Sequence, residues 1–246
     1  LFYAPGYVVV ADHQAADELE RELLSGACSN AAAADLVRYG AAALRAWADR
    51  MARPYAPVCL TLYPNHACNL VCTYCFSEPA DASARLSMET VQTAARMVAA
   101  NCRTRGLPLT LVLHGGGEPS LNRRHADMLL DAVETAAAET GVPVFRYIAT
   151  NGVMSAGKVR WLAQRFDLIG LSCDGPPDVQ GQQRPLPGGA SSALYVERTA
   201  RTLHEVGARL HVRVTVTPAT LYRQVEIADY VCRVLRPEEI HVEPVY

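Results

Sequence analysis

The stretch "VCLTLYPNHACNLVCTYCF", residues 58–76, places three cysteines in a polar loop directly after an apolar, β-branched run. These cysteines are Cys68, Cys72 and Cys75. Cysteine thiolates bind zinc or iron–sulfur clusters, and a closed structural site needs four ligands. Three thiolates therefore predict one of two sites: a cluster with one iron left open for another ligand, or a structural zinc site with His66 as fourth ligand.

After this loop, strand patterns alternate with helix patterns. We expect strands at 58–63, 109–114, 142–150, 167–173, 209–217 and 239–245. We expect helices at 87–102, 123–141, 156–166, 192–207 and 221–235. Ser87 is a predicted N-cap, and Gly141 is a predicted helix end. Such alternation indicates βαβ units and a parallel sheet, whose loops at the carboxyl ends of the strands gather along one rim.

Three further loops would share that rim with the cysteines. "GGGEP" (115–119) follows the second predicted strand, "TNG" (150–152) the third and "SCDGPP" (172–177) the fourth. Glycines let a backbone come close to a ligand. The carboxylate of Glu118 suits an ammonium group and argues against a phosphate-binding loop at a helix N-terminus.

Together these motifs resemble the radical S-adenosylmethionine (SAM) superfamily. The Cx3CxxC spacing after a first strand, with Tyr74 before the last cysteine, matches its signature, and "GGGEP" matches its second motif. "TNG" and "SCDGPP" resemble one branch, the peptide-maturase and anaerobic sulfatase-maturating (SPASM-type) enzymes. The resemblance implies an α/β fold, a partial (β/α)6 barrel, with a [4Fe-4S] cluster on Cys68, Cys72 and Cys75.

The resemblance also implies the chemistry. SAM would bind the open iron and be cleaved reductively to a 5′-deoxyadenosyl radical, with the electron coming from an external one-electron donor. The radical would abstract hydrogen from a peptide or protein side chain, an oxidoreductase-type modification as in the maturation of ribosomally made peptides. The alternatives are a sulfatase-type protein maturase, a small-molecule radical SAM enzyme, and a non-catalytic zinc-binding module that uses His66.

Family positions can be carried over to individual residues. The glycine loop, which would hold the amino group of SAM, supplies Gly116, Gly117, Glu118 and Pro119. Tyr74 and the backbone near Phe76 would pack against the adenine. The other expected cofactor-binding residues are Asn151, Ser172, Asp174, Arg184 and Arg198. The branch usually continues with "HDxxR", whereas this chain has "VQGQQRP", which keeps the arginine and lacks the His–Asp pair.

Length, charge and hydrophobicity give no reason to expect a nucleic-acid-binding, membrane-bound or secreted protein. The chain has 246 residues, 50% of them hydrophobic, and a net charge of -2. This length suffices for one large domain, and the charge gives no reason to expect nucleic acid or an anionic membrane as partner. No apolar run approaches the roughly 20 residues of a membrane span, and the N-terminus lacks signal-peptide features. We therefore expect a soluble, cytoplasmic chain.

Two segments are expected. Residues 1–57 read as a small α-rich pre-barrel segment with a strand at 7–11 and helices at 15–26 and 30–51. Residues 58–246 read as the radical SAM core. Members of the branch often carry a Cys-rich extension with auxiliary clusters after the core. This sequence stops directly after the sixth predicted strand, so we expect a fragment or a chain from which any such extension was removed.

Five more cysteines are scattered along the chain, mostly in apolar or helical settings. A disulfide framework is not expected in a cytoplasmic chain. We therefore predict that these five are small buried hydrophobic residues. They are Cys28, Cys59, Cys102, Cys173 and Cys232.

Overall fold

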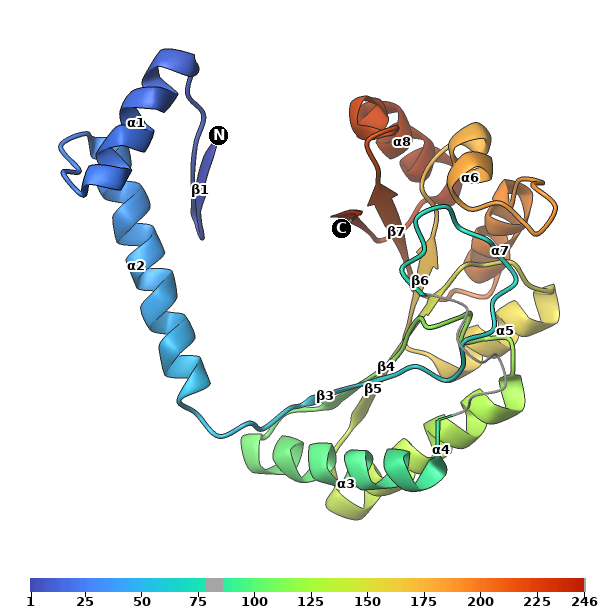
Figure 1. Ribbon diagram of the computed structural model, residues 1–246. Coiled ribbons are helices and arrows are strands. Elements are labelled where there is room, and N and C mark those ends of the chain that lie inside the picture. The colour runs from blue at the N-terminus through green and yellow to red at the C-terminus, as the bar shows by residue number, and fades with distance from the viewer. Residues whose placement is uncertain (78–85, 246) are drawn as a thin grey trace. The chain divides into compact units, whose positions relative to one another are not determined.

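The computed structural model describes residues 1–77 and 86–245. The chain divides into two units, Leu1–Tyr55 and Ala56–Tyr246 (Figure 1). None of the helices within the described ranges is long and apolar enough to cross a membrane.

The first unit is a hairpin followed by two helices. Strands β1 (Phe2–Ala4) and β2 (Tyr7–Val9) pair antiparallel. Helices α1 (His13–Ser25) and α2 (Ala31–Met51) follow, and a side chain caps each at its N-terminus. The strand predicted at 7–11 is present as β2, and its partner β1 was not predicted. A small core holds the unit together; it consists of Ala4, Leu19, Ala33 and Leu36.

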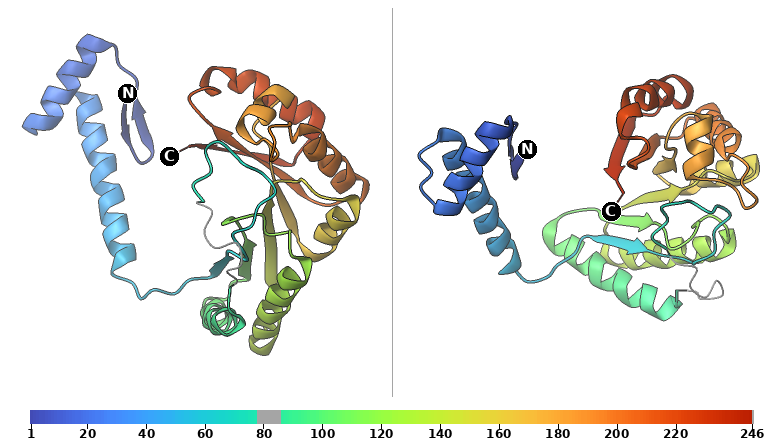
Figure 2. Two further views of the ribbon diagram at one scale, coloured as in Figure 1. Left: turned by 45° about the vertical axis from the view of Figure 1, so that its right-hand side comes forward. Right: turned by 45° about the horizontal axis from the view of Figure 1, so that its top comes forward.

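The second unit is built on six parallel strands. They are β3 (Cys59–Leu62), β4 (Leu109–Leu113), β5 (Val144–Thr150), β6 (Leu168–Ser172), β7 (Leu210–Val216) and β8 (Glu239–Pro244). Each strand pairs with the next one in the sequence, so the spatial order is β3-β4-β5-β6-β7-β8. This curved parallel sheet with helical crossovers confirms the predicted partial barrel (Figure 2).

Helices connect the strands of the second unit. They are α3 (Met88–Arg105), α4 (Arg123–Thr140), α5 (Ala156–Arg165), α6 (Pro177–Gln183), α7 (Ala193–Glu205), the 3₁₀ turn η1 (Leu221–Arg223), α8 (Gln224–Tyr230) and the π-helical turn η2 (Val231–Leu235). Ser87 caps α3 through its hydroxyl, and Gly141 ends α4 in the left-handed conformation, both as predicted. Helix α6 lies in a segment that we had taken for a loop.

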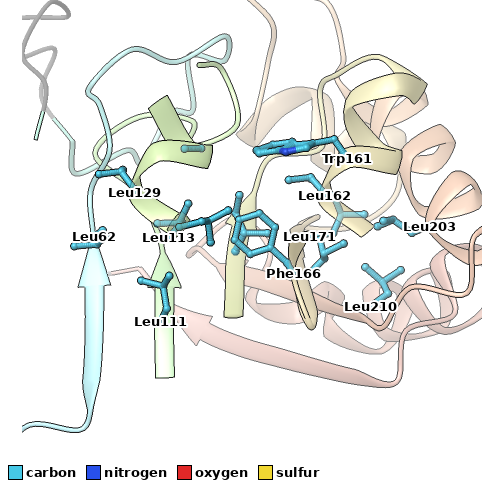
Figure 3. Packing of buried hydrophobic residues seen from close by; sticks show 14 of the residues in the cluster. Leu62, Leu111, Leu113, Leu129, Trp161, Leu162, Phe166, Leu171, Leu203 and Leu210 are labelled. Atoms are coloured by element: carbon cyan, nitrogen blue, oxygen red, sulfur yellow. The ribbon is translucent and has the colours of Figure 1, made fainter. Parts of the chain in front are cut away.

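The core lies between the sheet and these helices. Alternate residues of β4 (Leu109, Leu111 and Leu113) are fully buried on the helix side, as strand geometry requires. Figure 3 shows Leu111 and Leu113 in the same cluster as Trp161 and Leu162 of α5. The other alternate residues therefore face the concave side of the sheet, where the site is found.

The scattered cysteines are only partly buried. Cys102 and Cys173 are buried, as predicted, and burial raises the pKa of Cys173 to about 12. Cys28 is half-buried. The prediction is wrong for Cys59 and Cys232, which are exposed, because an apolar sequence neighbourhood does not reveal which way one side chain points.

Candidate functional site

A cavity of about 870 Å³ lies at the carboxyl ends of the strands. It brings together all of the predicted site residues except Asp174 and Arg198. The cysteine loop contributes Cys68, Cys72, Tyr74, Cys75 and Phe76. The glycine loop contributes Gly116, Gly117, Glu118 and Pro119, and later segments contribute Asn151, Ser172 and Arg184.

The cysteine loop is anchored by a distant part of the chain. The backbone N–H of Val71 donates to the carbonyl of Pro185, and that of Thr73 donates to the carbonyl of Gln183, both at 3.0 Å. Within the loop, the N–H of Cys75 donates to the carbonyl of Cys72 at 3.2 Å. The C-terminal end of α6, a helix that we did not predict, therefore holds the loop that carries the thiols.

The thiols of this loop influence one another. Burial raises the pKa of Cys68, and it raises the pKa of Cys72 to about 11, although the nearby charge of Arg184 opposes the second shift. The charge of Cys75 adds to both increases. At neutral pH these two groups stay protonated unless a cation displaces the protons, which is the usual behaviour of a cysteine metal site before loading.

His66 was the candidate for a fourth zinc ligand. It lines the same cavity, and its Nδ1 is shielded from solvent and has no hydrogen-bond partner among the described residues. Within residues 1–77 and 86–245, no three side chains of His, Cys, Asp or Glu are grouped closely enough to hold a metal ion. This finding applies equally to the three cysteines of the loop and to a four-ligand zinc arrangement with His66, so it favours neither kind of site.

The glycine loop packs directly on the cysteine loop. The N–H of Glu118 donates to the carbonyl of Ala67 at 2.8 Å, and a Cβ at Gly117 would overlap that carbonyl. Gly116 has φ +86°, and a Cβ there would lie 2.9 Å from the carbonyl oxygen of Asn65. We had expected these glycines to admit a ligand, and the structure shows that Gly117 first admits the backbone of the cysteine loop.

The Glu118 carboxylate is buried and accepts three hydrogen bonds. Its Oε1 accepts from the N–H of Ser120 at 3.0 Å and from the hydroxyl of Thr150 at 2.8 Å. Its Oε2 accepts from the N–H of Asn151 at 2.8 Å. Glu118 is only 2% exposed, so the carboxylate mainly ties the end of β4 to the end of β5.

The "TNG" loop completes this connection. Thr150 binds Glu118, and the Asn151 side chain reaches Cys68, with 3.7 Å between Nδ2 and Sγ. Gly152 has φ +75°, and a Cβ there would overlap Leu171. The cysteine loop, the glycine loop and the "TNG" loop are therefore in contact with one another.

Asp174 lies behind the cavity wall and is fully buried. Its Oδ2 accepts from the hydroxyl of Tyr74 at 2.7 Å, from Arg184 Nε at 2.9 Å and from Gln183 Nε2 at 2.9 Å, while its Oδ1 accepts from the N–H of Thr215 at 3.0 Å. Predicted to bind the cofactor, Asp174 instead positions two residues that line the cavity.

These two residues, Tyr74 and Arg184, form one packed pair. The guanidinium lies over the Tyr74 ring at 5.4 Å from its centroid. Burial alone would lower the pKa of Arg184, but the Asp174 carboxylate, together with smaller contributions from Tyr74 and Cys72, raises that pKa above its ordinary value. Burial also raises the pKa of Tyr74, so the phenol stays neutral and donates to Asp174.

Of the remaining predicted residues, three line the cavity and Arg198 does not. Ser172, the last residue of β6, and Pro119 line the cavity, as does Phe76, which is 79% exposed. Arg198 is exposed on α7 and is not among the residues that line the cavity. The structure does not bring Arg198 to the site, because its helical position points it toward solvent.

The cavity also has a polar wall that we did not predict. Arg213 of β7 donates through Nη2 to Glu243 of β8 at 2.9 Å, and its Nη1 contacts Nε2 of His114 at the end of β4. Burial, followed by the charge of Arg213, lowers the pKa of His114. The alternation in β7 was the signal available in the sequence, since polar residues at 211, 213 and 215 alternate with apolar ones and must share the concave face.

No known protein-family profile matches the sequence. Among solved structures, the fold resembles native anSMEcpe with bound AdoMet (TM-score 0.67, 21% identity, 77% of this chain and 52% of that one). It also resembles SuiB from Streptococcus suis bound to its precursor peptide SuiA (TM-score 0.61, 21% identity, 82% and 42%). A third is methylornithine synthase, PylB (TM-score 0.55, 14% identity, 76% and 53%).

This chain thus spans about half the length of the solved chains that it resembles. Those proteins are radical SAM enzymes. At such identities the likeness concerns the fold, and it agrees with the cysteine and glycine motifs on one rim. The chain has the partial-barrel fold of the radical S-adenosylmethionine enzymes.

Proposed function

We propose that this chain is the core of a radical SAM enzyme that modifies a peptide or protein side chain. The observation that carries the proposal is the shared cavity: the Cx3CxxC loop and the "GGGEP" loop are hydrogen-bonded together and line one space of about 870 Å³. That volume is within the roughly 300–1,000 Å³ of small-molecule sites.

The residues present fit a [4Fe-4S] cluster and SAM. Cys68, Cys72 and Cys75 supply three soft thiolate ligands, the donor type that selects iron–sulfur clusters. When bound, the cluster and SAM supply the one-electron cleavage that yields a radical able to abstract hydrogen. The electron for this cleavage would come from an external one-electron donor.

The chain's own residues have distinct tasks in this proposal. Because the Glu118 carboxylate already accepts three protein donors, the amino group of SAM would bind backbone carbonyls of Gly116 and Gly117. Arg184 would pair with the carboxylate of SAM, Ser172 would hydrogen-bond to its ribose, and Tyr74 would stack near its adenine.

A peptide substrate is supported by one of the structural relatives. SuiB was solved with its precursor peptide SuiA bound. A sulfatase-type maturase and a small-molecule enzyme remain the alternatives, and PylB, a methylornithine synthase, has the same fold. Turnover assays with a peptide and with a free amino acid would distinguish these classes.

The proposal is tested by anaerobic reconstitution with iron and sulfide, followed by iron, sulfide and zinc analysis. We expect the chain to take up a cluster, and Cys72→Ala to lose it together with its visible absorbance. Cys232→Ala, which removes an exposed thiol outside the cavity, is the matched control and should retain the cluster. Tightly bound zinc that depends on His66, or full SAM cleavage by Cys72→Ala, would overturn the proposal.

A further inference from the structure

The side chain of Asn151 reaches the first cysteine of the loop from the end of β5. Its Nδ2 lies 3.7 Å from Cys68 Sγ and 2.8 Å from Asn69 Oδ1. Asn151 and Cys68 are 83 residues apart in the sequence, so only the fold brings this donor to the thiol.

The orientation of the Asn151 amide follows from its neighbours. The N–H of Val153 donates to Asn151 Oδ1 at 2.9 Å, and a backbone N–H can only donate. On the other side, Asn69 Nδ2 donates to the carbonyl of Val153 at 2.7 Å, which turns Asn69 Oδ1 toward Asn151. The Asn151 amide therefore has two hydrogens and two acceptors, one of which is the sulfur of Cys68.

The backbone of Asn151 is also fixed in place by hydrogen bonds to Glu118. The N–H of Asn151 donates to Glu118 Oε2 at 2.8 Å, and the hydroxyl of Thr150 donates to Glu118 Oε1. Asn151 is 7% exposed, so water does not compete effectively for its amide. The N–H group is thus preorganised on the sulfur before any metal binds.

We propose that Asn151 is a positioning residue that donates a hydrogen bond to the Cys68 thiolate when it ligates iron, and thereby raises the reduction potential of the cluster. The inference rests on the proposed function. A hydrogen bond to a ligating sulfur withdraws negative charge from it and favours the reduced, more negative cluster. By contrast, the Cys75 thiol itself donates, to the carbonyl of Ser77 at 3.8 Å, and this bond is lost when the thiol ligates.

The test is an EPR-monitored redox titration of the anaerobically reconstituted full chain, in wild type and in Asn151→Leu and Asn151→Asp. We expect a lower potential in Asn151→Leu, which lacks the donor, and a still lower one in Asn151→Asp, which turns a carboxylate oxygen toward the sulfur. Iron and sulfide content should equal that of wild type. Asn101→Leu is the matched control, because Asn101 donates to Pro57 away from the cavity and should leave the potential unchanged.

Each outcome is decisive. A potential equal to or above that of wild type in a cluster-loaded variant overturns the inference. Loss of the cluster from both variants also overturns it, because a residue that only tunes the potential is not needed to hold the cluster. If wild type itself takes up no iron and sulfide, the proposed function fails, and this result is distinct from the other two.

Discussion

Replacing Glu118 by glutamine tests the connection between the cysteine loop, the glycine loop and the "TNG" loop. The carboxylate is nearly inaccessible to solvent and accepts hydrogen bonds from the N–H groups of Ser120 and Asn151 and from the Thr150 hydroxyl. A hydrogen bond to a charged group contributes about 1.5–3 kcal/mol, and an unsatisfied buried donor costs about as much. We expect Glu118→Gln to lower the free energy of unfolding by about 3 kcal/mol.

This expectation follows from the directions of the donors. Glutamine has one acceptor oxygen, whereas the two backbone N–H groups approach different oxygens of Glu118. Whichever way the amide turns, its NH₂ faces a backbone N–H. Only the Thr150 hydroxyl can rotate to accommodate it.

The measurement is urea denaturation in a Trp47→Phe background, in which the buried Trp161 reports on the second unit alone. Asp131→Asn is the matched control, because it removes an exposed carboxylate paired with Arg165, and such surface pairs contribute about 0–1 kcal/mol. If Glu118→Gln unfolds at the same urea concentration as this control, the buried charge does not hold the strand ends together and the reasoning is wrong.

Two further changes probe neighbouring contacts. Gly117→Ala should push the glycine loop away from the Ala67 carbonyl and reduce iron uptake after reconstitution. Gly157→Ala is the control, because the space around Gly157 is open, and it should leave iron uptake unchanged. Equal iron uptake by both variants would contradict the packing argument. Folding lowers the pKa of His114, so on acidification the unfolded chain takes up this proton at a higher pH than the folded chain. The contribution of His114 to the free energy of unfolding is therefore present above pH 6.5 and is lost as the pH falls below it. His114→Asn should therefore lose less unfolding free energy than wild type on acidification, and an unchanged slope would refute this.

Much of the second unit could be predicted because its strands are apolar runs between clear helix patterns. The strand predicted at 109–114 is β4, Leu109–Leu113, and the strand-end motifs share a rim as parallel topology requires. Helix α6 was missed because two prolines and a glycine are typical of a loop, whereas Pro177 occupies the first turn, where proline is tolerated. Strand β1 was missed because three residues carry too little pattern.

The sequence could not show which way the carboxylates of Glu118 and Asp174 point. Glu118 and Asp174 follow strands and are adjacent to glycines, which suggested ligand contacts. In the structure both turn inward and accept hydrogen bonds from protein groups far away in the sequence, such as Thr150 for Glu118 and Thr215 for Asp174. The contact of Arg213 with His114 is likewise non-local, since two strands lie between β4 and β7.

The anchoring of the cysteine loop has a consequence for the order in which the protein is made. The loop is held by backbone groups near Gln183, about 110 residues later than Thr73. A ribosome releases the thiols first, and their support follows only after three more strands. Until then, closely spaced free cysteines are open to oxidation. Under the proposed function, iron that reaches the nascent chain before α6 has formed would meet cysteines whose loop is not yet held in place.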